Sequence, residues 1–248
     1  MNAYAAEFVG TALLILFGNG VVANVVLERT KGQNSGWIVI TAGWGFAVFV
    51  GAFCAAPYSG AHLNPAVTVA MALAGKLDAS LVPGYIAAQM AGAFVGASLV
   101  FAFYREHFKA SPDADSKLAC FSTAPNIRQM GQALFCETLG TFALIFPIFL
   151  MAPASVELPA SAGGVHAPLG LGSVGLLPVA LLVFAIGMSL GGTTGYAINP
   201  ARDLGPRLAH FVLPVPGKRD SDWGYAAVPV IGPLLGAALA AGAYSLVR

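Results

Sequence analysis

The sequence predicts an all-α integral membrane protein, with six transmembrane helices and two re-entrant half-helices arranged as an inverted repeat. Three observations lead to this prediction. The chain is 57% hydrophobic and 9% charged, whereas soluble domains carry about 25% charged residues. It contains six apolar stretches long enough to cross the roughly 30 Å hydrocarbon core of a bilayer. The tripeptide Asn-Pro-Ala occurs twice, at 64–66 and 199–201, and each copy precedes an apolar segment too short to cross.

The rest of the composition excludes several classes of function. A net charge of +1 gives no indication of a nucleic-acid partner. Three widely spaced cysteines, Cys54, Cys120 and Cys136, form no Cys-x-x-Cys pair, so they predict neither a disulfide framework nor a metal site. The acids and histidines do not gather into a nucleophile and base, and the sequence has no phosphate-binding Gly-x-x-x-x-Gly-Lys run. We therefore expect no enzyme activity, no catalytic residue, no cofactor and no metal.

Six stretches are apolar over a length that crosses a bilayer as a helix, which takes about 20 residues. They cover 4–27, 37–56, 82–104, 130–151, 171–190 and 225–247. No basic segment precedes the first stretch, which predicts a retained span and not a cleaved signal peptide. The strands of a membrane barrel would instead alternate apolar and polar residues. The pattern therefore favours a helical bundle.

Each Asn-Pro-Ala copy predicts the start of a short helix. Asn is a strong N-cap residue, and Pro fits the first helical position because its missing N–H would have no partner there. From Asn64 to the turn at Gly75, a helix covers roughly 15 Å, about half of the bilayer core. Irregular backbone at membrane depth is tolerated only where protein encloses it or a watery cavity adjoins it. One such Asn-Pro is more often an ordinary helix cap, but two at equivalent positions indicate a pathway or a binding site.

The two halves of the chain resemble each other. The segment that begins at Glu7 returns at Glu137, and the two Asn-Pro-Ala copies correspond. Two further pairs are Gly92 with Gly232 and Gly96 with Gly236. Small residues at this spacing let membrane helices approach closely. The sequence thus predicts a single membrane channel domain, 1–248, whose repeat halves, 1–110 and 130–248, are joined by an external loop, 108–129.

Each half contains three spans, an odd number, so the second half must enter the membrane in the opposite orientation. The half-helices then meet tip to tip, with Asn64 near Asn199. Each helix N-terminus carries roughly half a positive charge, so the pair of tips disfavours cations. Each Asn can cap its own helix with its side-chain oxygen and point its NH2 group into the pathway as a donor.

The residues before each Asn are expected to be non-helical, which leaves their backbone carbonyls to line one wall as acceptors. These residues are Gly60, Ala61, His62, Leu63, Ala197 and Ile198. A wall of acceptors opposite apolar side chains suits a small neutral solute that carries several hydroxyl groups on a carbon backbone. It suits an ion poorly. The imidazole of His62 is expected to line the inner end of the pathway.

The two copies resemble the paired motifs of the aquaporin superfamily, the major intrinsic proteins. They read Asn64-Pro65-Ala66 and Asn199-Pro200-Ala201-Arg202-Asp203. Two other segments resemble the glycerol-facilitator, or aquaglyceroporin, branch: the Asp203 extension with Gly205-Pro206-Arg207, and the run from Phe121 to Asn126. The likeness covers essentially the whole chain and implies the aquaporin-like fold.

The resemblance implies a selectivity filter built from four residues, which fall here on Trp44, Gly187, Tyr196 and Arg202. Trp44 and Tyr196 would form an apolar corner for CH groups, while the Arg202 guanidinium donates to two adjacent hydroxyls and repels cations. Gly187 leaves room for a carbon chain where water-selective relatives usually carry histidine, although it could simply be a packing glycine. Tyr196 departs from the phenylalanine of the best-known bacterial facilitator, and its phenol either narrows the filter or adds a polar partner.

Two carboxylates, Glu7 and Glu137, fall inside apolar spans. Because a charged side chain is costly there, both residues are candidates for a functional role. They either form a proton relay or accept backbone N–H groups from the irregular loops. Their equivalence in the repeat, and the resemblance, favour the second interpretation. Asp203 is expected to be a third buried structural acid. Trp37 and Trp223 lie at span ends, where tryptophan anchors a protein in the membrane interface.

The resemblance implies a passive channel for glycerol and similar small neutral solutes, with water as a co-permeant and with ions and protons excluded. Other polyols and urea belong to the same solute class. A water-selective channel would share everything except the wide filter, and a proton-coupled transporter would use Glu7 or Glu137. The expected partners are these solutes, water and the lipid bilayer. A homotetramer is implied by the family likeness alone.

The orientation in the membrane follows from the resemblance and not from charge. The resemblance implies a multi-pass plasma-membrane protein with both termini in the cytoplasm. Basic residues favour the cytoplasmic side, yet this orientation leaves only Lys76 and Arg248 there. We keep it because Arg202 and Arg207 belong to the re-entrant segment and several other basic residues stand beside acids.

Overall fold

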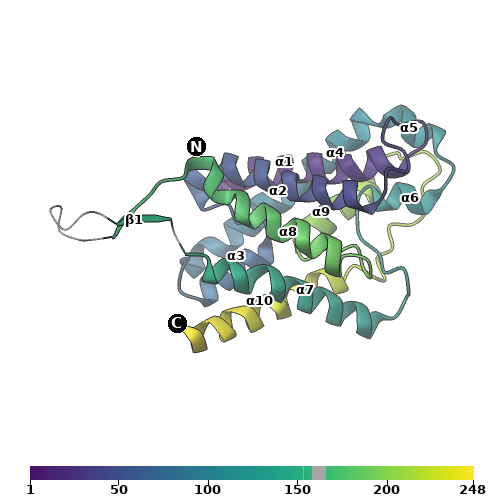
Figure 1. Ribbon diagram of the computed structural model, residues 1–248. Helices are drawn as coiled ribbons and strands as arrows, with labels where there is room; N and C mark the ends of the chain where they lie inside the picture. Colours follow the sequence, from purple (N-terminus) through teal and green to yellow (C-terminus); the bar gives the residue numbers. More distant parts are fainter. Residues whose placement is uncertain (153, 158–165) are drawn as a thin grey trace.

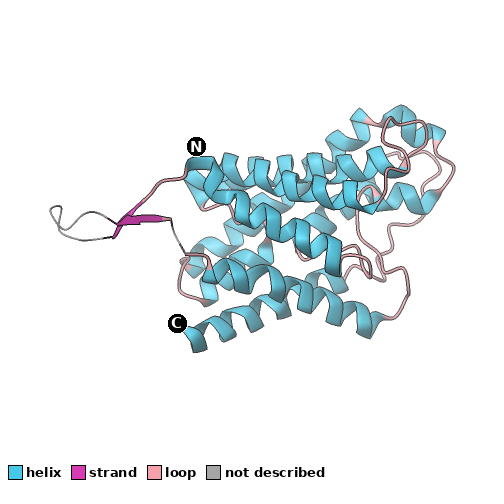
Figure 2. Cartoon of the chain, in the orientation of Figure 1, coloured by secondary structure: helices cyan, strands magenta, loops and turns pink. Residues whose placement is uncertain are grey.

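The computed structural model describes residues 1–152, 154–157 and 166–248, and these form an α-helical bundle (Figures 1 and 2). Six helices in this part of the chain are long and apolar enough to cross a membrane. They comprise α1 (Ala3–Val26), α2 (Trp37–Ser59), α4 (Val82–Phe103), α7 (Met130–Leu150), α8 (Leu177–Leu190) and α10 (Val228–Val247), and the spans of α4 and α8 reach their full lengths, Ala79–Phe103 and Gly172–Leu190, by including the turn before each helix. The predicted fold class is confirmed. The fifth span begins as a 3-10 turn, η3 (Gly172–Leu176), and α4 follows a similar turn, η1 (Ala79–Leu81).

Glycines allow close packing within each half. Helix α1 packs against α2 and α4, α7 packs against α10, and α2 also packs against α8. A Cβ atom on Gly96 of α4 would lie 2.5 Å from the carbonyl oxygen of Ala12 on α1. A Cβ atom on Gly236 of α10 would collide with the carbonyl of Thr138 on α7. The glycine four residues earlier in each pair also leaves no room for a Cβ atom, so the predicted small-residue packing is confirmed at equivalent places in both halves.

The two half-helices are α3 (Pro65–Leu73) and α9 (Pro200–Val212). Asn64 and Asn199 are their N-caps, both with an extended backbone at φ −158°. The Oδ1 atom of each Asn accepts a hydrogen bond from the backbone N–H two residues later, at 2.9 Å in α3 and 3.0 Å in α9. With 9 and 13 residues, these helices are too short to cross a core about 30 Å thick.

Helix α9 differs from the predicted apolar segment. Its charged and polar side chains Arg202, Asp203, Arg207 and His210 are all buried. The prediction of an apolar segment was wrong for α9, because contacts with distant loops let this helix bury charged side chains. Buried charge is stable when ion pairs and hydrogen bonds satisfy it, and the loops around α9 provide these partners.

The two ends of the bundle differ in their connecting segments. Two short helices, α5 (Arg105–Ala110) and α6 (Ala114–Ala119), cover one end. Both chain termini and the antiparallel pair of β1 (Ser155–Glu157) and β2 (His166–Pro168) lie at the other end (Figure 1). The sequence did not predict the strand pair or the short helices. Below, outer denotes the α5–α6 end and inner denotes the end that carries the termini.

Candidate functional site

The tips of the two half-helices meet inside the bundle. The Nδ2 atom of Asn64 donates to the carbonyl of Ile198 at 2.8 Å, and the Nδ2 atom of Asn199 donates to the carbonyl of Leu63 at 2.8 Å. The bonds are reciprocal, as expected where two inverted halves face each other. Each NH2 group has a second N–H, and both Asn residues line the same cavity. One donor per Asn therefore stays available to a solute.

The six residues predicted to supply carbonyl acceptors all lie in the wall of that cavity. They are Gly60, Ala61, His62, Leu63, Ala197 and Ile198. The prediction that all six carbonyls are free needs correction, because those of Leu63 and Ile198 already accept from the opposite Asn. A carbonyl oxygen has two lone pairs, so each can still accept a second, weaker bond.

The backbone of both loops is held in an unusual conformation. Ala61, Leu63 and Ile198 have φ values of 53°, 52° and 43°, in the left-handed region that residues with a side chain seldom adopt. Such a residue costs on the order of 1–3 kcal/mol, so it persists only where neighbouring groups fix it. In each loop the fixing group is a buried carboxylate.

Glu7 fixes the first loop. Its Oε1 atom accepts from the backbone N–H of His62 at 2.9 Å, and its Oε2 atom accepts from that of Leu63 at 2.7 Å. The Ser59 hydroxyl and the Gln89 amide also donate to it, at 2.6 and 2.8 Å. The carboxylate is fully buried and all its contacts are donors. Gln89 had no recognisable signal in the sequence, because a single amide in an apolar span resembles an ordinary packing residue.

Glu137 fixes the second loop in the same way. It accepts from the backbone N–H groups of Ala197 and Ile198 at 3.0 and 2.7 Å, and from the Thr194 hydroxyl at 2.7 Å. It too is fully buried. Neither Glu7 nor Glu137 is among the residues that line the two cavities along the pathway. The geometry thus agrees with the interpretation in which both acids hold the loops. A proton relay through these acids would not reach either of the two cavities.

Two cavities, of about 240 and 370 Å³, meet at the predicted filter. The inner one contains the Asn pair, and the outer one lies beneath the segment that follows α6. They share three lining residues, Trp44, Tyr196 and Arg202, which are 3%, 5% and 6% exposed. The Arg202 guanidinium lies over the Trp44 ring, with its Cζ atom 4.0 Å from the ring centre. The structure therefore brings three of the four predicted filter residues together where the two cavities meet.

Two polar atoms at this junction are buried without a hydrogen-bond partner in the described part of the chain, namely Nη1 of Arg202 and Oη of Tyr196. Buried donors are normally paired, because an unpaired one costs about 1–3 kcal/mol. Both residues line two connected cavities, so a molecule in the pathway can supply the partner. A solute with hydroxyl oxygens can do so.

Gly187 acts differently from the prediction. The sequence interpretation gives the space at this glycine to a carbon chain, but the Tyr196 ring occupies it. A Cβ atom at Gly187 would lie 2.9 Å from both Cζ and Oη of Tyr196 and 2.8 Å from Cγ2 of Thr41. A Cβ atom at Gly191 would lie 2.5 Å from the same ring. The absence of side chains at these two glycines therefore lets the phenol pack against the end of α8.

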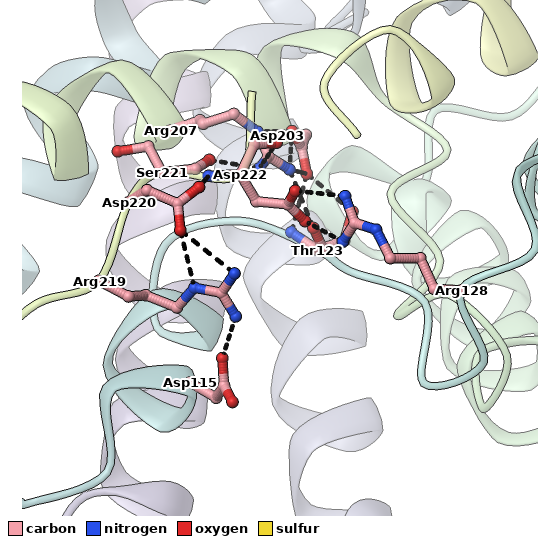
Figure 3. Close-up of polar contacts among 9 residues, drawn as sticks. All are labelled: Asp115, Thr123, Arg128, Asp203, Arg207, Arg219, Asp220, Ser221 and Asp222. Carbon is pink, nitrogen blue, oxygen red and sulfur yellow. Dashed lines mark hydrogen bonds and ion pairs between the residues drawn. The ribbon is translucent and has the colours of Figure 1, made fainter. Parts of the chain in front are cut away.

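A buried ion pair fixes α9 to the outer loops (Figure 3). Arg207 donates from Nε to Asp203 at 2.8 Å, and both side chains are fully buried. Arg207 also donates to the carbonyls of Thr123 and Ser221, at 2.9 and 2.7 Å. Asp203 in turn accepts from the backbone N–H and the hydroxyl of Thr123, at 2.8 and 2.7 Å. Asp203 is thus buried and structural in position, but no pattern in the sequence identified Arg207 as its partner.

Further ion pairs lie at the outer surface, also shown in Figure 3. Arg128 donates two hydrogen bonds to Asp222, at 2.9 and 2.6 Å. These bonds hold the pKa of the Asp222 carboxyl below its ordinary value. Arg219 pairs with both Asp115 and Asp220. Together with the buried pair, these contacts join the segment 115–128 to the segment that follows α9.

Comparisons with known proteins agree with this geometry. A family model described as "Major intrinsic protein" matches residues 1–244. The chain is 52% identical to a probable glycerol uptake facilitator protein of Thermotoga maritima over 245 residues, 99% of either chain. It is 49% identical to a glycerol uptake facilitator protein of Streptococcus pneumoniae, again over 99% of both. Among solved structures, the X-ray structure of the aquaglyceroporin from Plasmodium falciparum is similar, with a TM-score of 0.79 at 31% identity, and the match covers 97% of this chain and 93% of that one.

Proposed function

The chain belongs to the major intrinsic protein family, and from that premise we propose that it is a passive channel for glycerol and other small neutral solutes. Water is a co-permeant, and ions and protons are excluded. The protein is a multi-pass membrane protein, and its family is one of channels and not of enzymes. The observation that carries the proposal is the junction of the two cavities, where unpaired donors face a pathway with one apolar and one polar side.

At the filter, the apolar and polar sides of the solute contact different residues. Its carbon backbone lies against the rings of Trp44 and Tyr196, and its hydroxyl oxygens accept from Arg202. Nη1 of Arg202 has no partner within the described residues, so a hydroxyl replaces a missing bond and does not compete with an existing one. Gly187 contributes to the filter because its lack of a side chain leaves space for the Tyr196 ring. We assign the filter to these four residues.

At the midpoint of the pathway, Asn64 and Asn199 bind the solute as it passes from the outer to the inner part of the pathway. Each Asn offers one N–H to a hydroxyl oxygen, and the free carbonyls of the two loops accept hydroxyl hydrogens. The N-termini of α3 and α9 place roughly half a positive charge each at this point, which opposes cations. Arg202 adds a full positive charge further out. Glu7, Glu137 and Asp203 serve as the buried structural acids that keep this arrangement in place.

Glycerol entry into proteoliposomes, followed by light scattering with and without a proton gradient, tests the function. We expect faster entry than into protein-free liposomes, with a rate that rises linearly with glycerol concentration and does not respond to an uncoupler. These outcomes follow because neither Glu7 nor Glu137 faces the lumen. Saturable entry that collapses with the uncoupler would indicate a coupled transporter. Water flux without glycerol flux would indicate a water-selective channel.

The organisation of the chain is part of the proposal. One channel domain spans 1–248, its repeat halves are 1–110 and 130–248, and the loop 108–129 joins them on the outer side. The reciprocal Asn bonds and the matched glycine pairs support the repeat. We also include urea among the solutes and a homotetramer as the assembly. Urea swelling assays and the mass of the purified protein in detergent test these two points.

We place the protein in the plasma membrane with both termini in the cytoplasm. The resulting excess of basic residues on the outer side runs against the usual bias, because basic residues favour the cytoplasm. Several of these residues are bound within the fold. Arg207 is in a buried ion pair, Arg128, Arg219 and Lys109 are paired with acids, and Lys117 and Lys218 donate to backbone carbonyls.

Side-specific labelling of cysteine variants tests this orientation. The Glu106 side chain is 75% exposed on α5, so Glu106→Cys should react with a membrane-impermeant maleimide added outside intact cells. Arg248→Cys should react only after the cells are opened. The parent protein, whose three cysteines are buried or half-buried, provides the background. The reverse pattern of labelling would place the termini outside.

A further inference from the structure

Trp37 occupies an unexpected position for an interface anchor. It is the first residue of α2 and is 41% exposed. Its indole does not only face outward, however. It lines the outer cavity together with Tyr196 and Arg202, and it contacts two of the four filter positions.

The first contact is a hydrogen bond to α8. Nε1 of Trp37 donates to the carbonyl oxygen of Gly187 at 3.0 Å. Gly187 lies in the last turn of α8, where helix carbonyls lack intrahelical partners. The indole thus satisfies a carbonyl that α8 itself leaves open. The bond fixes the start of α2 to α8 at the glycine that receives the Tyr196 ring.

The second contact is with the Tyr196 ring itself. The two rings are arranged edge to face, with centres 5.9 Å apart and planes at 77°. Tyr196 therefore lies between the glycines of α8 on one side and Trp37 on another. This contact is separate from the one that fixes the other half of the filter, where Arg202 lies over Trp44.

We propose that Trp37 is a positioning residue of the filter: by holding the Gly187 carbonyl and the Tyr196 ring together, it sets the largest polyol that passes. This inference rests on the proposed function. Without the indole, the Tyr196 ring loses its outer support and can lean into the space that Trp37 filled. The constriction between Tyr196, Trp44 and Arg202 then widens, and longer polyols gain more than glycerol does.

Trp223 offers a matched control. It is also 41% exposed, and it makes an edge-to-face contact, 5.8 Å and 77°, with Phe211. Phe211 is 60% exposed, and Trp223 lines neither of the two pathway cavities. If tryptophan at a span end acts only as an interface anchor, changes at the two positions should have the same consequences.

The test compares Trp37→Leu and Trp37→Phe with Trp223→Leu and Trp223→Phe in proteoliposomes. Permeability to xylitol, a five-carbon polyol, and to glycerol is measured on the same vesicles. The xylitol-to-glycerol ratio does not depend on how much protein is incorporated, so a variant that merely inserts poorly leaves the ratio unchanged. Water permeability on these vesicles provides a second reference.

We expect Trp37→Leu, which removes both contacts, to raise the ratio at least about fivefold, because a hydrogen bond or an aromatic pair is each worth roughly a fivefold change in an equilibrium. Trp37→Phe keeps a ring beside Tyr196 but loses the N–H, so we expect a rise of about fivefold, the effect of the hydrogen bond alone. Both Trp223 variants should match the parent protein.

A ratio in Trp37→Leu equal to that in Trp223→Leu would overturn the inference. If Trp37→Leu does not insert into the vesicles, Trp37→Phe provides the same test. A parent-like ratio in Trp37→Phe would show that the hydrogen bond has no role in the filter, and it would overturn the proposal. A parent protein that passes glycerol while both Trp37 variants keep its ratio overturns this inference alone. A parent protein that passes no glycerol overturns the proposed function as well.

Discussion

Gly187→His is expected to reduce glycerol permeability by about tenfold or more, because overpacking a filled site costs about 1–3 kcal/mol. The Cβ atom alone would lie 2.9 Å from Tyr196 and 2.8 Å from Thr41. The Tyr196 ring must therefore leave its place against α8 and move toward Trp44 and Arg202. Water, which is smaller than glycerol, should lose much less permeability. The variant thus shifts the channel toward water selectivity.

Stopped-flow light scattering measures both quantities in one experiment, as osmotic shrinkage followed by glycerol entry. Gly187→Ala should give a smaller shift in the same direction, because it adds only the Cβ atom. Gly20→Ala is the control, since a Cβ atom at Gly20 on α1 would meet nothing within 4 Å. A parent-like ratio of glycerol to water permeability in Gly187→His would mean that this glycine does not control the filter.

Glu137→Gln is expected to abolish glycerol and water permeability together and to lower thermal stability. The carboxylate accepts from two backbone N–H groups and one hydroxyl. An amide turns an NH2 donor toward one of these donors, and each buried N–H left without an acceptor costs about 1–3 kcal/mol. The left-handed residue Ile198 then loses the group that fixes it. Glu7→Gln should have the same effect on the first loop.

Thermal unfolding in detergent and water permeability in proteoliposomes measure these effects. Thr138→Val is the control on α7, because Thr138 is half-buried and its hydroxyl donates only to the carbonyl four residues earlier. A proton relay predicts a different outcome, in which Glu137→Gln folds normally and keeps its water permeability. That result would contradict the structural role proposed for both acids.

The features that could be predicted from the sequence depend on neighbours along the chain. Long apolar segments determine the six spans, and the Asn-Pro pairs determine where α3 and α9 begin. Glu7 and Glu137 could be singled out because a carboxylate is costly, and therefore rare, inside an apolar span. The meeting of Asn64 and Asn199 followed from the odd number of spans in each half.

The features that could not be predicted depend on contacts between distant segments. The space at Gly187 is filled by a ring nine residues away, after the chain has turned. Arg207 is buried only because Asp203 and two distant loops satisfy it. Trp37 and Trp223 have the same local signal, a tryptophan at a span end, yet only the first of the two lines a pathway cavity. Such differences arise from packing between distant segments, so the local sequence pattern does not reveal them.

The most direct test of the whole account compares two permeabilities of the purified protein. Glycerol flux is measured in proteoliposomes, and ionic current is measured across a planar bilayer that contains the same preparation. Two positive helix tips, two Asn donors and Arg202 at a buried constriction predict rapid glycerol flux with no steady current in sodium or potassium chloride. A steady cation current, or glycerol entry no faster than through lipid alone, would contradict it.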